Sequence, residues 1–355
     1  MNSEPTYVFF TWEEISYSRT GVIFAGINHY LAKPVLKIIA LGTVLSMTKE
    51  VRMFIKRNKI SNPVYIIGSP CGLLVLSVRL AAPKSKIVFD TGWPQVDGLI
   101  SRENSFIPRI FKFFKMYVLD LLSFNFSNLI AVESHAQLKR VRKRFFVKEN
   151  KLFVSYTGLN EVHLRTSFQK GNSSDFNTQI VLFRGKFNHE AGLEFLAEIS
   201  WLIPDYINFI VICPNIPKDL IFSPTTKVIS ERISEAELVD YYSRAYLAIG
   251  QLGNSKRTEF TIPHKFFEAA YFKVPYLTQN TEGMRELIPE NDYDLFCDFD
   301  DPMKIARVII QYAHNRNVQK LSASLLAQNY QSRFSQEILS RDFDNHVKKF
   351  LKLKI

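Results

Sequence analysis

Short apolar runs of strand length alternate with stretches of helical periodicity along the chain. In the first half, the pattern predicts strands at 7–11, 35–41, 64–67, 86–89, 128–132 and 152–156, with helices at 22–33, 47–58, 72–80, 107–124 and 136–146. Strands that alternate with helices predict a parallel sheet covered on both faces.

A polar run at 169–175 separates a second series of the same kind. Its predicted strands lie at 179–184, 207–213, 226–230, 246–250 and 275–278, and its helices at 190–201, 234–244, 263–272 and 303–330. We therefore predict two Rossmann-like α/β domains, 1–165 and 166–335, facing each other across a cleft. A last amphipathic helix within 336–355 is expected to pack back on the N-terminal domain.

The charge is unevenly divided. Residues 1–165 hold 23 Lys and Arg against 11 Asp and Glu, a balance of +12, whereas the rest of the chain is at −1. This asymmetry predicts that the N-terminal half faces an anionic surface, such as phospholipid, an acidic polysaccharide or nucleic acid, and a solvated basic surface is the alternative.

The cysteine spacing and the hydropathy argue against a disulfide-rich, zinc-binding, secreted or membrane-spanning protein. Three widely spaced cysteines form no disulfide framework or zinc site, the first residues do not resemble a secretory signal, and no charge-free stretch is long enough to span a membrane. We therefore expect a cytoplasmic protein, and a peripheral position on the inner face of the cell membrane is compatible with this expectation.

A strand, a glycine and a helix follow one another at 183–192, with Arg184 and Lys186 on either side of Gly185. Such a turn presents backbone N–H groups and a helix N-terminus, which together with two cations suit phosphate. These three residues are candidates for phosphate binding, and an ordinary charged surface loop is the alternative.

A second segment, 261–275, contains a predicted helix that starts near Pro263, a residue suited to a first helical turn. The spacing places His264, Lys265 and Glu268 on one face, away from a packing face of Phe267, Ala270 and Tyr271. We therefore expect Glu268 to be exposed, so that Glu268→Ala costs little stability.

Both segments resemble the "group 1" family of retaining glycosyltransferases with the GT-B fold. The first is similar to the family's Gly-Arg turn, and Pro263-x-Lys265-x-x-Glu268-Ala resembles its Pro-x-Lys-x-x-Glu-Ala helix, over about residues 150–310. The resemblance implies a GT-B fold, a nucleoside diphosphate sugar as donor, and no cofactor. It assigns Glu268 to the ribose hydroxyls, with His264 and Lys265 beside the donor.

The sequence departs from the family pattern at three positions. Lys186 stands where the family has Arg, Ala191 where it has Lys, and Phe260 where retaining members have a second Glu. Glu259, one residue earlier, is the candidate to replace that Glu. The departures leave the donor sugar and the stereochemical outcome open.

In the N-terminal half, Asp90 follows a predicted strand and is the candidate acid/base residue, with Asp97 as a less well placed alternative. For each, a loop-capping role is the other interpretation. Gly21, near Ser18 and Thr20, is a candidate for close approach of the backbone to the donor phosphates.

Two Asp-x-Asp matches, 292–294 and 298–300, lie beyond the recognised helix in a region of loops and helix starts, so we predict no metal site there. Lys and Arg alternate with Phe at 106–115 and precede two Phe residues at 139–146. This pattern suits an anionic membrane surface, with core helices bearing solvated cations as the alternative. No nucleic-acid module accompanies the charge, so no nucleic-acid partner is predicted.

The sequence thus predicts a metal-independent glycosyltransferase that moves a hexose-type sugar to a carbohydrate or lipid-linked acceptor. Assembly of a surface polysaccharide or lipopolysaccharide is implied by the resemblance. A non-catalytic nucleotide- or sugar-binding protein on the same fold is the alternative, since fold alone does not give function.

Overall fold

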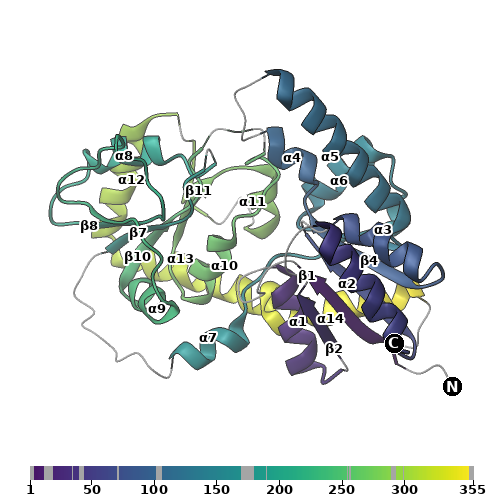
Figure 1. Cartoon of the computed structure of the whole chain (residues 1–355). Helices are drawn as coiled ribbons and strands as arrows, with labels where there is room; N and C mark the ends of the chain where they lie inside the picture. The colour runs from purple at the N-terminus through teal and green to yellow at the C-terminus, as the bar shows by residue number, and fades with distance from the viewer. Residues whose placement is uncertain are drawn as a thin grey trace. The chain divides into compact units, whose positions relative to one another are not determined.

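The structure is a computed structural model, and its contacts divide the chain into two compact units (Figure 1). The first unit comprises residues 1–162 and 335–355, and the second comprises residues 163–334. The sequence placed these boundaries after residues 165 and 335. The structure describes the chain outside residues 1–3, 12–18, 34, 40–43, 70–71, 101–105, 169–179, 189, 254, 256, 289–292, 299 and 352–355.

The first unit is built on a parallel sheet of order β2-β1-β3-β4-β5-β6. Its strands are β1 (Thr6–Thr11), β2 (Val35–Ile39), β3 (Pro63–Gly68), β4 (Lys86–Gly92), β5 (Leu129–Val132) and β6 (Leu152–Val154). Its helices are α1 (Arg19–Tyr30), α2 (Val44–Arg57), α3 (Gly72–Ala81), α4 (Gln95–Ile100), α5 (Phe106–Phe126), α6 (His135–Phe145) and α14 (Gln336–Leu351), with a 3₁₀ turn at Glu149–Lys151. Helix α7 (Glu161–Phe168) crosses into the second unit.

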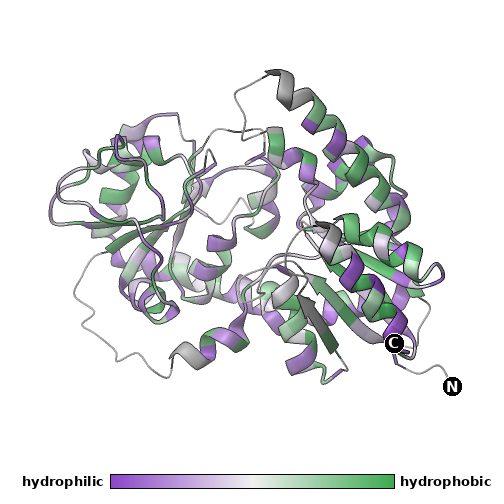
Figure 2. Cartoon of the chain, viewed as in Figure 1, coloured by the Kyte–Doolittle hydropathy of each residue, from purple (hydrophilic) through white to green (hydrophobic). Residues whose placement is uncertain are grey.

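Alternate residues of β1 point into two separate cores. Tyr7 and Phe9 pack with α1 and α14, whereas Val8 and Phe10 pack with α2, α3, α5 and α6. Both faces of the sheet are therefore covered, and the central residues of β1, β3, β4 and β5 are buried and apolar (Figure 2). The last helix packs directly against α1.

A buried polar cluster fixes α14 to the sheet. The Asp344 carboxylate accepts hydrogen bonds from the Tyr7 hydroxyl and the Lys33 ammonium, each at 2.6 Å, and pairs with Lys348 at 3.1 Å. Burial alone raises the pKa of Asp344, but the hydrogen bonds from Lys33 and Tyr7 outweigh it and lower the pKa. The carboxylate is thus held ionised in the interior, joining the two ends of the chain.

The second unit has a parallel sheet of order β12-β11-β10-β7-β8-β9. Its strands are β7 (Ile180–Arg184), β8 (Asn208–Ile212), β9 (Lys227–Ile229), β10 (Ala245–Ile249), β11 (Tyr276–Gln279) and β12 (Phe296–Cys297). Its helices are α8 (Leu193–Ser200), α9 (Glu235–Arg244), α10 (His264–Tyr271), α11 (Glu282–Leu287), α12 (Pro302–His314) and α13 (Arg316–Asn329), followed by a π-helical turn at Tyr330–Phe334.

Each sheet has one point where the direction of strand succession reverses. It lies between β1 and β3 in the first unit and between β7 and β10 in the second. At such a point the loops that leave the carboxyl ends of neighbouring strands diverge to opposite faces, which opens a crevice for ligands. The topology therefore selects these two strand edges as candidate sites.

Several element boundaries differ from those predicted, each for a local reason. Helix α1 begins at Arg19 rather than Val22, so Gly21 lies in its first turn, and β4 continues through Asp90 to Gly92. Helix α8 begins at Leu193 rather than Glu190, because residues 190–192 form a turn that bonds to the 252–253 backbone. Among the described helices, none is long and apolar enough to cross a bilayer.

Candidate functional site

The β7–α8 connection begins at the carboxyl edge where β7 adjoins β10. Arg184 is the last residue of β7, and the Gly185 N–H continues the ladder to the Ile212 carbonyl at 2.9 Å. A Cβ on Gly185 would lie 3.2 Å from the Phe183 ring and 3.4 Å from the Lys265 Nζ. The glycine therefore leaves room for the lysine, while Lys186 is exposed.

Gly192 ends this connection in a conformation that other residues rarely adopt. Its φ is 63°, and a Cβ there would lie 2.5 Å from the Gly253 N. The Gly253 N–H donates to the Glu190 carbonyl, and the Glu190 carboxylate pairs with Arg257 at 2.6 Å. These contacts hold the loop after β10 against the loop after β7.

Helix α10 starts at His264, with Pro263 as its N-cap rather than inside its first turn. Residues 265 to 270 are all buried, and Glu268 is only 2% exposed. The prediction that the face with Lys265 and Glu268 lies away from the packed side of the helix is therefore wrong. The helical spacing was right, but the face opposite the Phe267 core is covered by β7, α9 and the end of β10.

Three side chains from three elements hold the Glu268 carboxylate. Oε1 pairs with Arg184 at 2.9 Å and lies 3.3 Å from the His264 Nδ1, and Oε2 accepts from the Tyr242 hydroxyl at 2.9 Å. Burial raises the pKa of Glu268, but Arg184, His264 and Tyr242 outweigh it and bring the pKa to about 2. Glu268 is thus a fixed anion at neutral pH.

Lys265 is a buried cation with weak partners. Its Nζ lies 3.9 Å from the centroid of the Phe183 ring and 3.4 Å from the Gly250 carbonyl oxygen. Burial first, and then the positive charge of Arg184, lower its pKa to about 7. A lysine held in this way gains a strong partner when an anion enters, which is the expected property of a phosphate-binding group.

His264 has one nitrogen available. Its Nδ1 contacts Glu268, whereas its Nε2 is buried and has no hydrogen-bond partner among the described residues. The side chain is 22% exposed. Five predicted residues, Arg184, Gly185, His264, Lys265 and Glu268, thus come together at one strand edge, with Lys186 exposed on the adjoining turn.

Glu259 lies on the loop before α10 and is exposed. Its Oε1 accepts the Glu282 N–H at 3.0 Å, and its carbonyl accepts the Gly283 N–H at 3.0 Å. The side chain therefore bonds to the first turn of α11, where a negative charge is favoured. A role toward the donor sugar stays a prediction.

In the first unit, Asp90 near the carboxyl end of β4 meets the first turn of α1, beside the end of β3. The Asp90 carboxylate pairs with Arg19 at 2.6 Å and accepts from the Thr20 hydroxyl at 2.8 Å. Gly21 follows directly in the same turn and is buried. The structure thus brings Asp90 and Gly21 to one place, whereas Ser18 lies outside the described residues.

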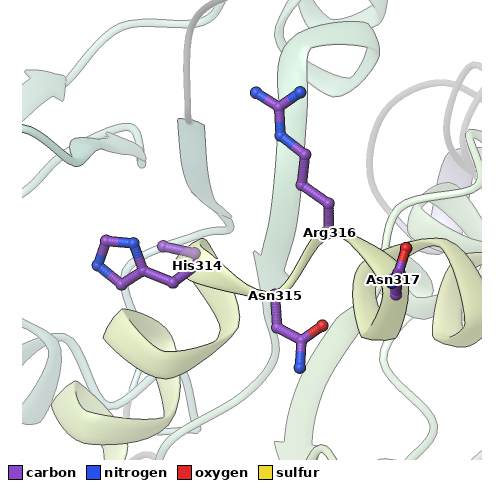
Figure 3. A pocket seen from close by; sticks show the side chains of 5 residues that line it. His314, Asn315, Arg316 and Asn317 are labelled. Carbon is purple, nitrogen blue, oxygen red and sulfur yellow. The ribbon is translucent and has the colours of Figure 1, made fainter.

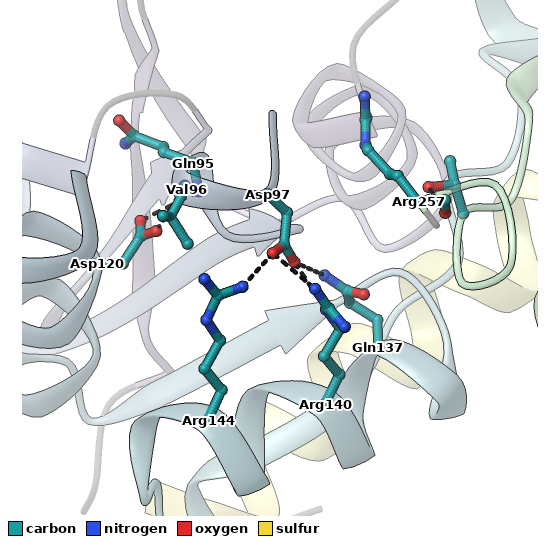
Figure 4. Close-up of polar contacts among 9 residues, drawn as sticks. Gln95, Val96, Asp97, Asp120, Gln137, Arg140, Arg144 and Arg257 are labelled. Carbon is teal, nitrogen blue, oxygen red and sulfur yellow. Dashed lines mark hydrogen bonds and ion pairs between the residues drawn. The ribbon is translucent and has the colours of Figure 1, made fainter. Parts of the chain in front are cut away.

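Asp97, the alternative acid/base candidate, is likewise buried and held by cationic side chains (Figure 4). Its carboxylate is bound by both Arg140 and Arg144, and Gln137 lies within 3.5 Å. Asp97 is 4% exposed, and the three partners all lie on α6. These contacts indicate that Asp97 fastens α4 to α6.

The Asp-x-Asp matches show no metal-binding arrangement within the described part of the chain. Asp294, Asp298 and Asp300 are exposed, Asp300 pairs with Lys304, and Asp292 lies outside the described residues. No group of three or more His, Cys, Asp or Glu among the described residues could hold a metal ion.

A shallow depression between α12 and α13 is lined by residues 313–317 (Figure 3). The side chains of His314, Asn315 and Arg316 point in different directions around it, and Asn315 caps α13. None of the candidate residues lines this depression, so it adds nothing to the site.

Sequence reasoning missed Tyr242, which belongs to a helix 26 residues before Glu268. The sequence around Tyr242 does not indicate a role in a binding site, because a Tyr on an amphipathic helix is usually a core residue. Only the packing of α9 beside α10 shows that its hydroxyl is directed at Glu268.

Solved structures share this fold. The chain superimposes on HepE from Anabaena in complex with UDP with a TM-score of 0.71 at 10% identity, covering 97% of this chain and 100% of HepE, and HepE is also known with UDP-glucose. It is similar to a UDP-forming trehalose-phosphate synthase from Burkholderia vietnamiensis (TM-score 0.66, 9% identity, 98% and 100% covered).

A protein from Listeria monocytogenes named as a UDP-N-acetylglucosamine 2-epimerase matches with a TM-score of 0.58 at 11% identity, over 98% of this chain and 97% of that one. No family model matches the sequence, and no curated protein matches it. At these identities the comparisons show the fold, which is the GT-B fold of two parallel α/β units.

Because Glu268 is buried, its truncation should destabilise the fold, whereas the sequence predicted little loss of stability. Glu268→Ala leaves Arg184, His264 and Tyr242 without their common acceptor, and removing one partner of a buried pair costs about 3–5 kcal/mol. We expect a clear fall in melting temperature. Glu259→Ala is the matched control, because that carboxylate is exposed; equal melting temperatures for the two variants would contradict the buried cluster.

Proposed function

We propose that this chain is a glycosyltransferase that moves a sugar from a nucleoside diphosphate sugar to a carbohydrate or lipid-linked acceptor. The observation that carries the proposal is the grouping of a fixed anion, Glu268, with the cations Arg184 and Lys265 at the strand edge where β7 adjoins β10. A dinucleotide or nucleotide sugar needs both an acceptor for ribose hydroxyls and cations for phosphates.

Six of the candidate residues have the following roles in this proposal. Glu268 accepts hydrogen bonds from the ribose, Lys265 and Lys186 neutralise the diphosphate, and the Gly185 backbone allows its close approach. In the first unit, Asp90 is the proposed acid/base residue for the acceptor hydroxyl, and Gly21 is the candidate for backbone contact with phosphate. The leaving diphosphate is stabilised by these cations and by backbone N–H groups, so turnover requires no metal.

The names of similar structures support a uridine nucleotide as the first donor to test. HepE has been solved with UDP and UDP-glucose, and the Burkholderia synthase is described as UDP-forming. The Listeria match carries the name of an epimerase, so the assay must separate transfer from isomerisation. Assembly of a surface polysaccharide or lipopolysaccharide is the proposed setting.

The basic N-terminal unit is proposed to contact an anionic membrane surface. Phe111 and Phe114 on α5 are 81% and 67% exposed, Phe146 after α6 is 86% exposed, and Lys112 and Lys115 are exposed beside them. These five residues are called the Phe/Lys patch. The Tyr117 ring stacks on Phe145 at 5.1 Å, so α5 and α6 are in contact close to the patch. Exposed rings beside cations suit the headgroup region.

Turnover is expected from UDP-sugars in the presence of a chelator. Release of UDP from UDP-glucose or UDP-N-acetylglucosamine should continue in EDTA, because cations of the protein replace a metal. Lys265→Met should abolish it. Binding without any turnover favours the non-catalytic alternative, an isomerised sugar favours an epimerase, and activity restored only by Mg²⁺ or Mn²⁺ contradicts metal independence.

Nucleotide affinity should depend on pH through Lys265. Its pKa is about 7 in the unoccupied site, and a diphosphate raises it, so binding takes up a proton above pH 7 but not below. We expect UDP-glucose to bind about fivefold to tenfold more weakly at pH 8 than at pH 6. Calorimetry in buffers of different ionisation enthalpy measures the proton uptake, and Lys265→Met should abolish both the uptake and this pH dependence.

Membrane contact should require both the rings and the cations. In flotation with vesicles at low salt, the protein should rise with anionic but not with neutral lipid. Replacing Phe111 and Phe114 together by Ser should abolish flotation, whereas Leu321→Ser, which changes an equally exposed apolar residue in the other unit, should not. Equal binding to neutral vesicles would contradict the electrostatic part of the proposal.

A further inference from the structure

The Glu268 carboxylate has little capacity left for a ligand. A carboxylate offers about four acceptor positions. Arg184 and His264 are directed at Oε1, and Tyr242 occupies one position on Oε2. A ribose presents two neighbouring hydroxyls, so it can engage this carboxylate fully only if one of the three present partners leaves.

Two of the partners are poorly placed to leave. Tyr242 is 2% exposed, and its ring stacks on Phe272 at 5.1 Å with an interplanar angle of 13°. Moving the ring away from Glu268 would leave its buried hydroxyl without an acceptor. His264 is on the same helix as Glu268, four residues before it, so the helix itself holds the two side chains together.

Arg184 is the partner that can leave. It is the most exposed of the three, at 31% of its side chain, and it sits at the end of β7 directly before Gly185 and the exposed Lys186. Its departure removes the ion pair of a buried carboxylate, which is unfavourable unless the guanidinium gains another anion. A diphosphate beside Gly185 supplies that anion.

We propose that Arg184 is a specificity-determining residue that makes ribose binding conditional on a diphosphate. In the unoccupied site it blocks Oε1 of Glu268. When a diphosphate enters, Arg184 turns from Glu268 to the phosphates, and the freed Oε1 accepts a ribose hydroxyl while Tyr242 keeps Oε2 in place. This inference rests on the proposed function, because it concerns the same donor site.

The exchange has a thermodynamic signature. A nucleoside without phosphate must break the Arg184–Glu268 pair with no compensation, so it binds weakly. Diphosphate and nucleoside, supplied as separate molecules, should each strengthen the binding of the other, because coupling between two sites is reciprocal. Independent subsites for phosphate and ribose would show no such coupling.

The test uses the wild-type chain, UDP, uridine and inorganic pyrophosphate. Calorimetry first establishes that UDP binds. Uridine affinity is then measured by NMR titration without and with saturating pyrophosphate, and we expect it to rise at least about fivefold. In Arg184→Gln, uridine alone should bind as tightly as it does to the wild type with pyrophosphate, and the coupling should disappear.

Lys186→Gln is the control, because this exposed cation does not contact Glu268; it should weaken pyrophosphate binding but preserve the coupling. Melting temperatures show whether Arg184→Gln remains folded, and the wild-type measurement needs no variant. UDP binding with uridine affinity unchanged or lowered by pyrophosphate would overturn the exchange and leave the proposed function standing. Absence of binding by UDP, ADP and GDP would overturn both.

Discussion

A negative charge buried at the carboxyl end of a parallel sheet is the constraint on which the candidate site depends. Glu268 is almost fully enclosed, and an ionised carboxylate is tolerated there because Arg184, His264 and the Tyr242 hydroxyl contact it. Its partners come from β7, α9 and α10, so these elements must hold their relative positions for the charge to be stable. The same arrangement gives the site a fixed acceptor at neutral pH.

The same arrangement destabilises the charged form of Lys265. It lies close to Arg184 in a buried environment, and both effects lower its pKa to about 7. A fold selected only for stability would place an apolar side chain here. Strained electrostatics of this kind are characteristic of functional sites, where a ligand supplies the missing charge.

The cationic side chains of the first unit differ in burial and in ion pairing, and the sequence alone does not show these differences. Arg140 and Arg144 are bound to the buried Asp97, and Arg142 pairs with Glu149, so these guanidinium groups stabilise the packing of α6 or are already paired. Lys112 and Lys115 are exposed, as are Phe111 and Phe114 on the same helix. Part of the positive charge of this half is therefore engaged in ion pairs within the unit.

The sequence by itself determined the two parallel α/β units and the elements that carry the candidate residues, because alternating apolar runs and helical periodicity are local signals. It located Arg184, Gly185 and Lys265 correctly at a strand-to-helix turn and on the helix that meets it. It could not determine burial, because the face of α10 that carries Glu268 is covered by residues distant in the chain. Three further features depend on tertiary contacts: the hydrogen bond from Tyr242 to Glu268, the ion pairs of Asp97 with α6, and the start of α1 at Arg19. In each, the strand order rather than the spacing along the chain brings the side chains together.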